Sequence, residues 1–274
     1  MEDPISRAVE HVRRRSLGGP MPDDLRVTLN FHPDVSTGDL AMIERLAHDG
    51  VYRSQFETGS SNGGLTAHPD GDRWLWESRL FGGAYDQAEI ALRPKYGALN
   101  HRNDPFGGSR RFGSCHLRLK PAVLARATFC YPDSHLHPDQ FGVADRMSLI
   151  ALAEVNPSGL EPLDDYVEAH VHGTVLIARD VEAVVLDPSY RATSVETVAS
   201  HLGCAVEWHQ GFGLSLERLD DCVSYRGAAA GQTLTELGEG GVVTPARIGA
   251  ARRQGLDPQL AKWAWHCVAR FGGR

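Results

Sequence analysis

The segment at residues 165–172, DYVEAHVH, alternates between polar and apolar side chains. Successive side chains of a β-strand point to opposite faces, so this alternation predicts a strand. Three small apolar residues would share one face, and the opposite face would carry Tyr166, Glu168, His170 and His172. A carboxylate between a phenol and two imidazoles could line an active site. The alternative is the solvated outer face of a half-buried sheet.

Other short strand-like and helical patterns follow one another without the regular rhythm of a doubly wound fold. The runs at 26–31 and 51–57 predict strands, and the spacing of apolar residues predicts helices at 39–48 and 142–154. We therefore expect an α+β fold.

The chain divides into three expected parts. A short helix lies within residues 1–23, and a larger domain covers residues 24–225. The Gly- and Ala-rich run at 226–243 is typical of a linker. Two helices should follow it, each opened by a capping residue and a proline, as a small appendage within residues 226–274.

Charge and composition exclude some classes of protein. The 274 residues carry 28 Lys and Arg against 35 Asp and Glu, a net charge of −7, which argues against a protein that coats nucleic acid. No apolar run is long enough for a membrane span, and residues 1–16 lack the apolar core of a signal peptide. We expect a cytoplasmic protein, or an effector exported without a classical signal, with no membrane partner. Five scattered cysteines without a C-x-x-C pair predict reduced thiols.

Residues 58–114 are rich in glycine and poor in regular patterns, which indicates a binding site. The match to G-x-S-x-G at 59–63 is interpreted as a turn, because no helical pattern follows it. The segment 102–111, RNDPFGGSRR, could hold a phosphate through backbone N–H groups and arginines, or could be a flexible basic loop.

Two H-x-H pairs, at 135/137 and 170/172, could ligate zinc or iron. No H-E-x-x-H occurs and no third ligand stands at a usual spacing. We therefore expect no metal, and a metal-dependent hydrolase remains an alternative.

A series of short motifs resembles an uncharacterised bacterial family, domain-of-unknown-function family 3626, over residues 24–212. That resemblance supplies no chemistry. Its motifs are HPD (32–34), YRSQFETGSSNGG (52–64), FGGAYD (81–86), RPKYGALN (93–100), RFGSCHLRL (111–119), RATFCYPDS (126–134) and EAHVHG (168–173).

The order of elements also resembles ADP-ribosyltransferases of the His-Tyr-Glu kind, including their DNA-modifying toxin branch. A strand ends in His, a helix and the segment at 49–53 follow, and a Glu stands on a late strand. The resemblance implies a split mixed sheet that clasps NAD as a substrate. In that fold the strand-end His holds a ribose, a Tyr packs on nicotinamide, and the Glu stabilises the oxocarbenium-like state as nicotinamide leaves.

Carried onto this chain, the resemblance places His32 first, Tyr96 in the middle with Tyr85 in reserve, and Glu168 last. His32 is followed by Pro33 rather than a small residue, and no second Glu precedes Glu168 by two positions. An Arg-Ser-Glu variant, with Arg26 first and Thr58 or Ser60 in the middle, also remains open. The residues implied in NAD binding are Arg26, His32, Arg53, Thr58, Ser60, Tyr96, Arg111 and Ser114.

Three functions follow as expectations. The first is an NAD-consuming mono-ADP-ribosyltransferase or NAD glycohydrolase whose acceptor is a protein, a nucleic acid, a small molecule or water. The second is a metal-dependent hydrolase that uses the H-x-H cluster. The third is a non-enzymatic binding module of the toxin or immunity type.

Overall fold

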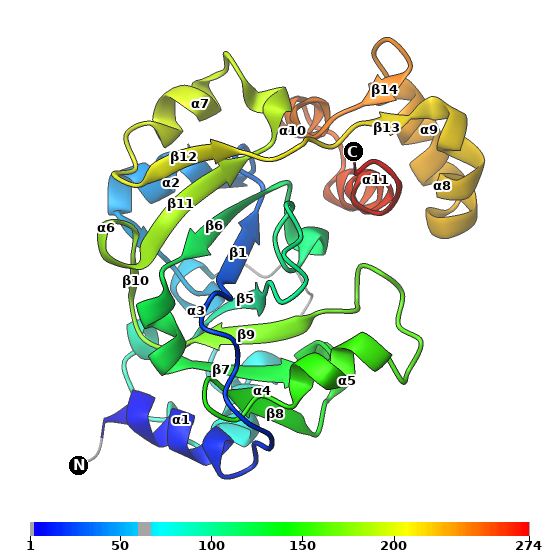
Figure 1. Ribbon diagram of the computed structural model, residues 1–274. Coiled ribbons are helices and arrows are strands. Elements are labelled where there is room, and N and C mark those ends of the chain that lie inside the picture. Colours follow the sequence, from blue (N-terminus) through cyan, green and yellow to red (C-terminus); the bar gives the residue numbers. More distant parts are fainter. Residues whose placement is uncertain (1–2, 60–66, 274) are drawn as a thin grey trace.

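One eight-stranded sheet forms the centre of the structure (Figure 1). The computed structural model describes residues 3–59 and 67–273. Neighbouring strands are antiparallel except β11 and β12, so the sheet is mixed and the predicted α+β class is confirmed. In spatial order the strands are β12 (Ala205–Trp208), β11 (Val181–Leu186), β6 (Cys115–Leu119), β1 (Val27–Phe31), β5 (Lys95–Leu99), β9 (Val167–Val171), β7 (Ala127–Tyr131) and β8 (Gln140–Val143).

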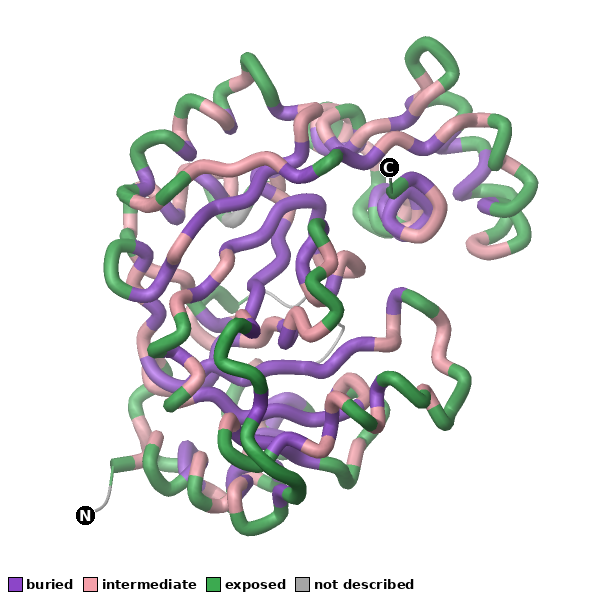
Figure 2. The backbone as a smooth tube through the Cα atoms, in the orientation of Figure 1, coloured by how far each residue is buried: buried purple, intermediate pink, exposed green. Residues whose placement is uncertain are grey.

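One face of this sheet is apolar and forms the main hydrophobic core. Leu29, Leu117 and Ala169 lie on it and are fully buried. Helices α2 (Met42–Asp49), α5 (Leu149–Val155) and α7 (Ser194–Ala199) contribute side chains to the same core. Burying each large apolar side chain there contributes about 1.5–3 kcal/mol. Figure 2 shows the central strands buried along most of their length.

The opposite face carries polar side chains and is nevertheless covered. Helices α1 (Pro4–Arg13) and α4 (Asp72–Leu80) pack with β7 and β8 in a separate apolar cluster. The segment 100–113 covers β1, because Gly108 N donates to Thr28 Oγ1 at 2.8 Å and Asn30 Nδ2 donates to the Phe106 carbonyl oxygen at 2.8 Å. The polar face of this sheet is therefore an interior surface rather than a solvated one.

Four C-terminal helices surround a second hydrophobic core, to which Phe106 and Leu163 also belong. The expected linker at 226–243 is wrong, because a helix occupies residues 228–237. Alanine favours helix, and Leu234 and Leu237 are buried in the core. The two expected terminal helices are confirmed, and the division into domains stays a prediction. The four helices are α8 (Leu219–Arg226), α9 (Ala228–Leu237), α10 (Pro245–Arg253) and α11 (Pro258–Phe271).

Two other expected elements differ from the structure. Residues 51–57 hold only a two-residue strand, and a short helix then begins after Ser54 because Ser54 and Glu57 form a capping box. The helix expected at 142–154 begins at Leu149, since residues 140–143 pair with β7 as β8.

The remaining elements are short. None of the helices in the described parts of the chain has the length and apolar character to span a membrane. They comprise β2 (Ser36–Thr37), β3 (Leu40–Ala41), β4 (Val51–Tyr52), β10 (Val175–Leu176), β13 (Leu214–Ser215), β14 (Val242–Val243), α3 (Gln55–Thr58), α6 (Ile177–Asp180), and the 3-10 helices η1 (Ile90–Leu92), η2 (Arg110–Phe112), η3 (Pro121–Arg126), η4 (Ser134–Leu136), η5 (Pro188–Tyr190) and η6 (Leu216–Arg218).

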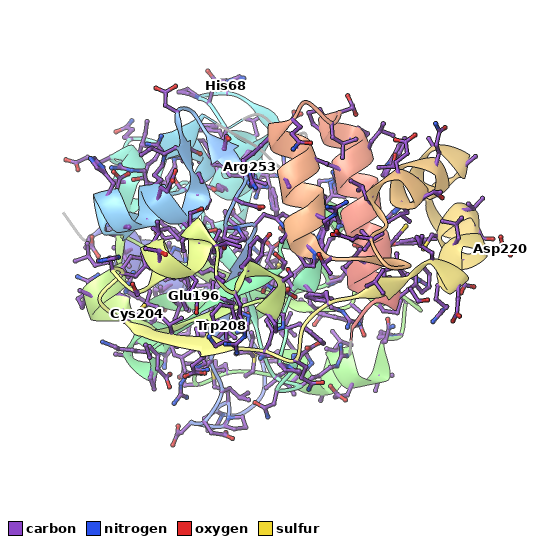
Figure 3. All side chains as sticks on the ribbon, turned by 90° about the horizontal axis from the view of Figure 1, so that it is seen from above. His68, Glu196, Cys204, Trp208, Asp220 and Arg253 are labelled. Atoms are coloured by element: carbon purple, nitrogen blue, oxygen red, sulfur yellow. The ribbon has the colours of Figure 1, made fainter. Side chains whose placement is uncertain are left out.

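The C-terminal helices are held to the sheet at the end of β1. Arg253, the last residue of α10 and labelled in Figure 3, donates to Asp34 Oδ2 at 2.9 Å. Tyr190 OH donates to the other oxygen of Asp34 at 3.1 Å. The helix can approach this closely because residue 249 is a glycine, and an added Cβ would overlap the Asp34 carboxylate.

We expect Gly249→Ala to destabilise the protein by about 1–3 kcal/mol, because the methyl group forces α10 away from Asp34. Thermal unfolding measures this as a lower Tm. Gly19→Ala is the matched control, since nothing lies within 4 Å of its added Cβ. Equal melting temperatures for the two variants would contradict the close approach of α10.

Candidate functional site

The polar face of β9 meets two neighbouring strands in matched rows. Directly opposed residues of antiparallel strands share a face. Glu168 stands opposite Ala98 of β5 on one side and opposite Cys130 of β7 on the other. His170 stands opposite Tyr96 and Thr128 in the same way. The sheet register therefore gathers a carboxylate, an imidazole, a phenol, a thiol and a hydroxyl.

Glu168 is 6% exposed, and one oxygen of its carboxylate, Oε1, has several partners within the protein. His170 Nε2 lies 2.8 Å from Glu168 Oε1, and Ser134 Oγ donates to the same oxygen. Cys130 Sγ lies 3.9 Å from it. Burial, and then the nearby charge of Asp133, raise the pKa of Glu168 above its usual range, although the hydrogen bonds oppose this effect.

The two imidazoles of β9 are joined by one hydroxyl. Thr128 Oγ1 lies 3.1 Å from His170 Nδ1 and 2.9 Å from His172 Nε2. The other ring nitrogen of His172 lies 2.7 Å from Tyr85 OH. Burial, and then the charges of His170 and Arg126, hold the pKa of His172 well below its usual range. His172 is therefore a neutral imidazole fixed on both sides.

Tyr96 lies on β5, and two residues of helix α4 contact its side chain. Its hydroxyl donates to Glu77 Oε1 at 2.9 Å, and the guanidinium of Arg73 lies 4.5 Å from the centre of its ring. Arg93 pairs with the second oxygen of Glu77 at 2.7 Å. Burial raises the pKa of Glu77, and the Arg93 and Arg73 charges counteract it. Tyr96 therefore belongs to a buried network of paired charges beside His170.

His32 directly follows strand β1, which is the neighbour of the Tyr96 strand β5 in the sheet. Its ring contacts Trp265 of α11 edge to face, with the ring centres 4.8 Å apart. Burial, and then the positive charge of Arg252, lower the pKa of His32 to about 4. His32 is therefore a neutral imidazole at neutral pH.

The sheet separates between His32 and Tyr96. Strands β1 and β5 pair only through Val27 with Leu99 and Thr28 with Ala98, although each strand has five residues. Beyond Thr28 no ladder joins them, whereas β5 and β9 pair along all five residues of each strand. The end of β1 near His32 and the start of β5 near Tyr96 therefore diverge, although the other neighbouring strands of the sheet stay paired.

The other residues implied in NAD binding are dispersed. Arg26 lies at the opposite end of β1 from His32 and donates to Glu182 at 3.0 Å. Arg53 pairs with Asp49 at 2.8 Å, and Thr58 is tied to the backbone of its own helix. Ser114 is fully buried and its carbonyl oxygen lies 2.8 Å from a nitrogen of His209.

Arg111 and Ser60 are the last two residues implied in NAD binding. Arg111 pairs with Asp164, and its carbonyl oxygen accepts a hydrogen bond from Trp265 at 2.9 Å, on the side of the sheet where His32 lies. Ser60, like most of the G-x-S-x-G match, lies outside the described residues.

A polar pocket of about 250 Å³ lies at the other end of β9 from His172. Asn100, Gly108, Arg110 and Tyr166 are among its lining residues. Tyr166 lies two positions before Glu168 and so shares its strand face. The segment 102–111 contributes residues to this pocket, and the binding site expected in the glycine-rich stretch stays a prediction.

Sequence reasoning missed several residues of the network. Ser134, Thr128 and Cys130 come from the segment RATFCYPDS, and Glu77 and Arg73 come from α4. The alternation of Thr128 and Cys130 was a usable signal, because it predicts a second strand with polar side chains on one face. Arg73 and Glu77 are four residues apart and so share a helix side.

The fold and the site define an α+β protein with a buried, hydrogen-bonded polar network on one face of a large mixed sheet. A family model described as "Protein of unknown function (DUF3626)" matches residues 26–157 and 147–269, so the chain belongs to that family. The expected membership is confirmed, over a longer part of the chain than expected. No curated protein matches the sequence.

The raised pKa of Glu168 predicts a characteristic dependence of stability on pH. A carboxyl whose pKa is higher in the folded protein than in the unfolded chain loses stability as the pH rises between the two values. Glu168→Gln removes the buried charge and keeps the shape. We expect it to unfold at a higher temperature than the parent at pH 7–8, with the difference shrinking toward pH 4. Thermal melts across this range measure it, and a less stable variant at pH 8 would contradict the assignment.

Proposed function

We propose that this chain is an NAD-consuming enzyme of the ADP-ribosyltransferase type, which transfers ADP-ribose from NAD to an acceptor or to water. Glu168 is its catalytic carboxylate, and His32 and Tyr96 bind NAD. The observation that carries the proposal is the short pairing of β1 with β5, over two residues only. It fits the split sheet that the resemblance implies, with the His32 and Tyr96 ends of the two strands on either side of the separation.

The order of strands supports the same assignment. The strand of Tyr96 lies between β1, which ends just before His32, and the strand of Glu168. Thr28, Ala98 and Glu168 form one cross-strand row, so the three strands present the same face. This row brings residues that are far apart in the sequence onto one face of the sheet.

The chemistry suits a buried carboxylate. As the bond between the ribose carbon and nicotinamide breaks, its electron pair leaves with nicotinamide and positive charge develops on the sugar. A fixed carboxylate stabilises this charge strongly where water is excluded. Ser134 and His170 fix the orientation of Glu168, and Glu77 fixes that of Tyr96.

We expect Glu168→Gln to lower the rate of nicotinamide release from NAD by about 10²–10³-fold, the usual effect of removing one electrostatic stabiliser. The parent rate should rise with pH through a carboxyl pKa above the ordinary range, since the ionised form of Glu168 is required. Release of nicotinamide, separated by chromatography, is the measurement.

Glu236→Gln is the matched control, because Glu236 is exposed on α9 in the C-terminal helices. It should release nicotinamide at the parent rate. An unchanged rate in Glu168→Gln would reject the role of Glu168, and a parent protein without nicotinamide release would reject NAD as the substrate.

A second candidate is a zinc-dependent enzyme, and one observation favours it. Ligand atoms of Cys130, Glu168 and His170 all lie within 4.8 Å of one another. A thiolate, an imidazole and a carboxylate are usual zinc ligands. Thr128 at the second nitrogen of His170 resembles the outer partner that orients a metal-bound imidazole. His172 is not part of this group, because Thr128 and Tyr85 engage both of its nitrogens.

Metal analysis separates the two candidates, since Glu168 cannot serve both. The zinc candidate predicts about one zinc per purified chain and its loss in Cys130→Ser, with Cys204→Ser as the control at a half-buried thiol elsewhere. The NAD proposal predicts no bound zinc and nicotinamide release that persists after treatment with a chelator.

A further inference from the structure

The pocket of about 250 Å³ beside the start of β9 has no part in the NAD chemistry proposed above. Residues of the segment 100–110 form one side of it, and residues between Asn156 and Tyr166 form the other. Arg102 and Pro162 also line the pocket and are exposed, so it opens to solvent. Its volume lies just below the roughly 300–1,000 Å³ of pockets that hold drug-sized ligands. A ligand smaller than a dinucleotide therefore suits it.

Hydrogen bonds within the protein fix the glycine-rich side of the pocket. The Asn100 side chain accepts from Asp104 N at 2.9 Å and donates to the Asp104 carbonyl oxygen at 2.9 Å. Gly108 N donates to Thr28 Oγ1 of β1 at 2.8 Å. Gly108 also lies so close to β5 that an added Cβ would stand 2.9 Å from the Ala98 side chain. This side of the pocket is therefore formed before a ligand binds, which lowers the entropic cost of binding.

Arg110 brings to the pocket a positive charge that no described residue neutralises. Within the described parts of the chain, its guanidinium makes neither a hydrogen bond nor an ion pair. The other arginines of the segment are engaged, because Arg102 pairs with Asp165 at 3.0 Å and Arg111 pairs with Asp164. Arg110 is half-buried and lines the pocket, so its donors are available to a ligand.

Asp104 supplies a negatively charged acceptor at the same pocket. Its Oδ1 accepts from Phe106 N at 2.8 Å, which orients the carboxylate. Neither of its oxygens has a cationic partner among the described residues. A bare anion would suit this pocket poorly, because the carboxylate repels it. A ligand that carries both an anionic group and hydroxyls suits it better, since carboxylates accept hydrogen bonds from sugar hydroxyls.

We propose that this pocket binds a small phosphorylated sugar, with Arg110 holding the phosphate group and Asp104 accepting hydrogen bonds from the sugar hydroxyls. The planar guanidinium of arginine binds phosphate through two parallel hydrogen bonds. Such a ligand carries a single phosphate group, so the proposal goes beyond NAD consumption and does not depend on it. Ribose 5-phosphate carries both kinds of group and serves as the probe.

Calorimetric titration of the full chain with ribose 5-phosphate and with inorganic phosphate, at constant ionic strength, tests the site. We expect ribose 5-phosphate to bind saturably and more tightly than inorganic phosphate. Arg110→Gln should weaken both ligands by about tenfold, as loss of one charge-assisted contact does. Asp104→Asn keeps an oxygen for Phe106 N and should reduce the preference for ribose 5-phosphate by about three- to tenfold. Relief of the repulsion favours both ligands, whereas the hydroxyl contact exists only with the sugar.

Arg191→Gln and Asp220→Asn are the matched controls. Arg191 lies over the Trp208 ring, and Asp220, labelled in Figure 3, is exposed at the start of α8. Parent affinity in both controls, with weaker binding in Arg110→Gln at an unchanged Tm, supports the site. No saturable binding at millimolar ribose 5-phosphate, equal weakening in Arg191→Gln, or an unchanged preference in Asp104→Asn overturns the proposal. The titrations contain no NAD, so their outcome is independent of nicotinamide release.

Discussion

His170 Nε2 lies 2.8 Å from Glu168 Oε1 on the covered face of the sheet, where burial keeps water away from both groups. A buried carboxylate is costly unless it is hydrogen-bonded, so the surrounding chain must supply partners. Ser134 supplies one, and Thr128 completes the bonding of His170 from the next strand. Covering these groups requires α1, α4 and the segment 100–113 on a face that the alternation of β9 alone would leave open.

The local sequence pattern predicted these strands, because the alternation of polar and apolar residues depends only on neighbouring positions. The run at 26–31 and the segment at 165–172 both contain strands of the central sheet, and Glu168 and His170 share a face as expected. Their burial and partners could not be predicted. Pairing of β9 with β5 and β7 joins segments separated by about forty to seventy residues, and no local pattern encodes that register.

Composition gave a wrong prediction at residues 226–243, where packing of the chain determines the structure. The run at 226–243 contains several glycines, which suggested a linker, yet its alanines favour helix and Leu234 and Leu237 fill a core. Arg110 and Asp104 were visible in the sequence within RNDPFGGSRR. Their place at one pocket depends on how that segment packs against β1, and no local pattern encodes this contact.

The C-terminal helices are therefore more than an appendage to the sheet. Asp34 holds α10 beside the end of β1, and Trp265 of α11 contacts His32 directly. The same indole donates to the Arg111 carbonyl oxygen, so η2 and the His32 side of the separated strands share one structural support. A change that loosens α11 would alter both places at once, which gives the C-terminal helices a direct physical route to influence the candidate site on the sheet.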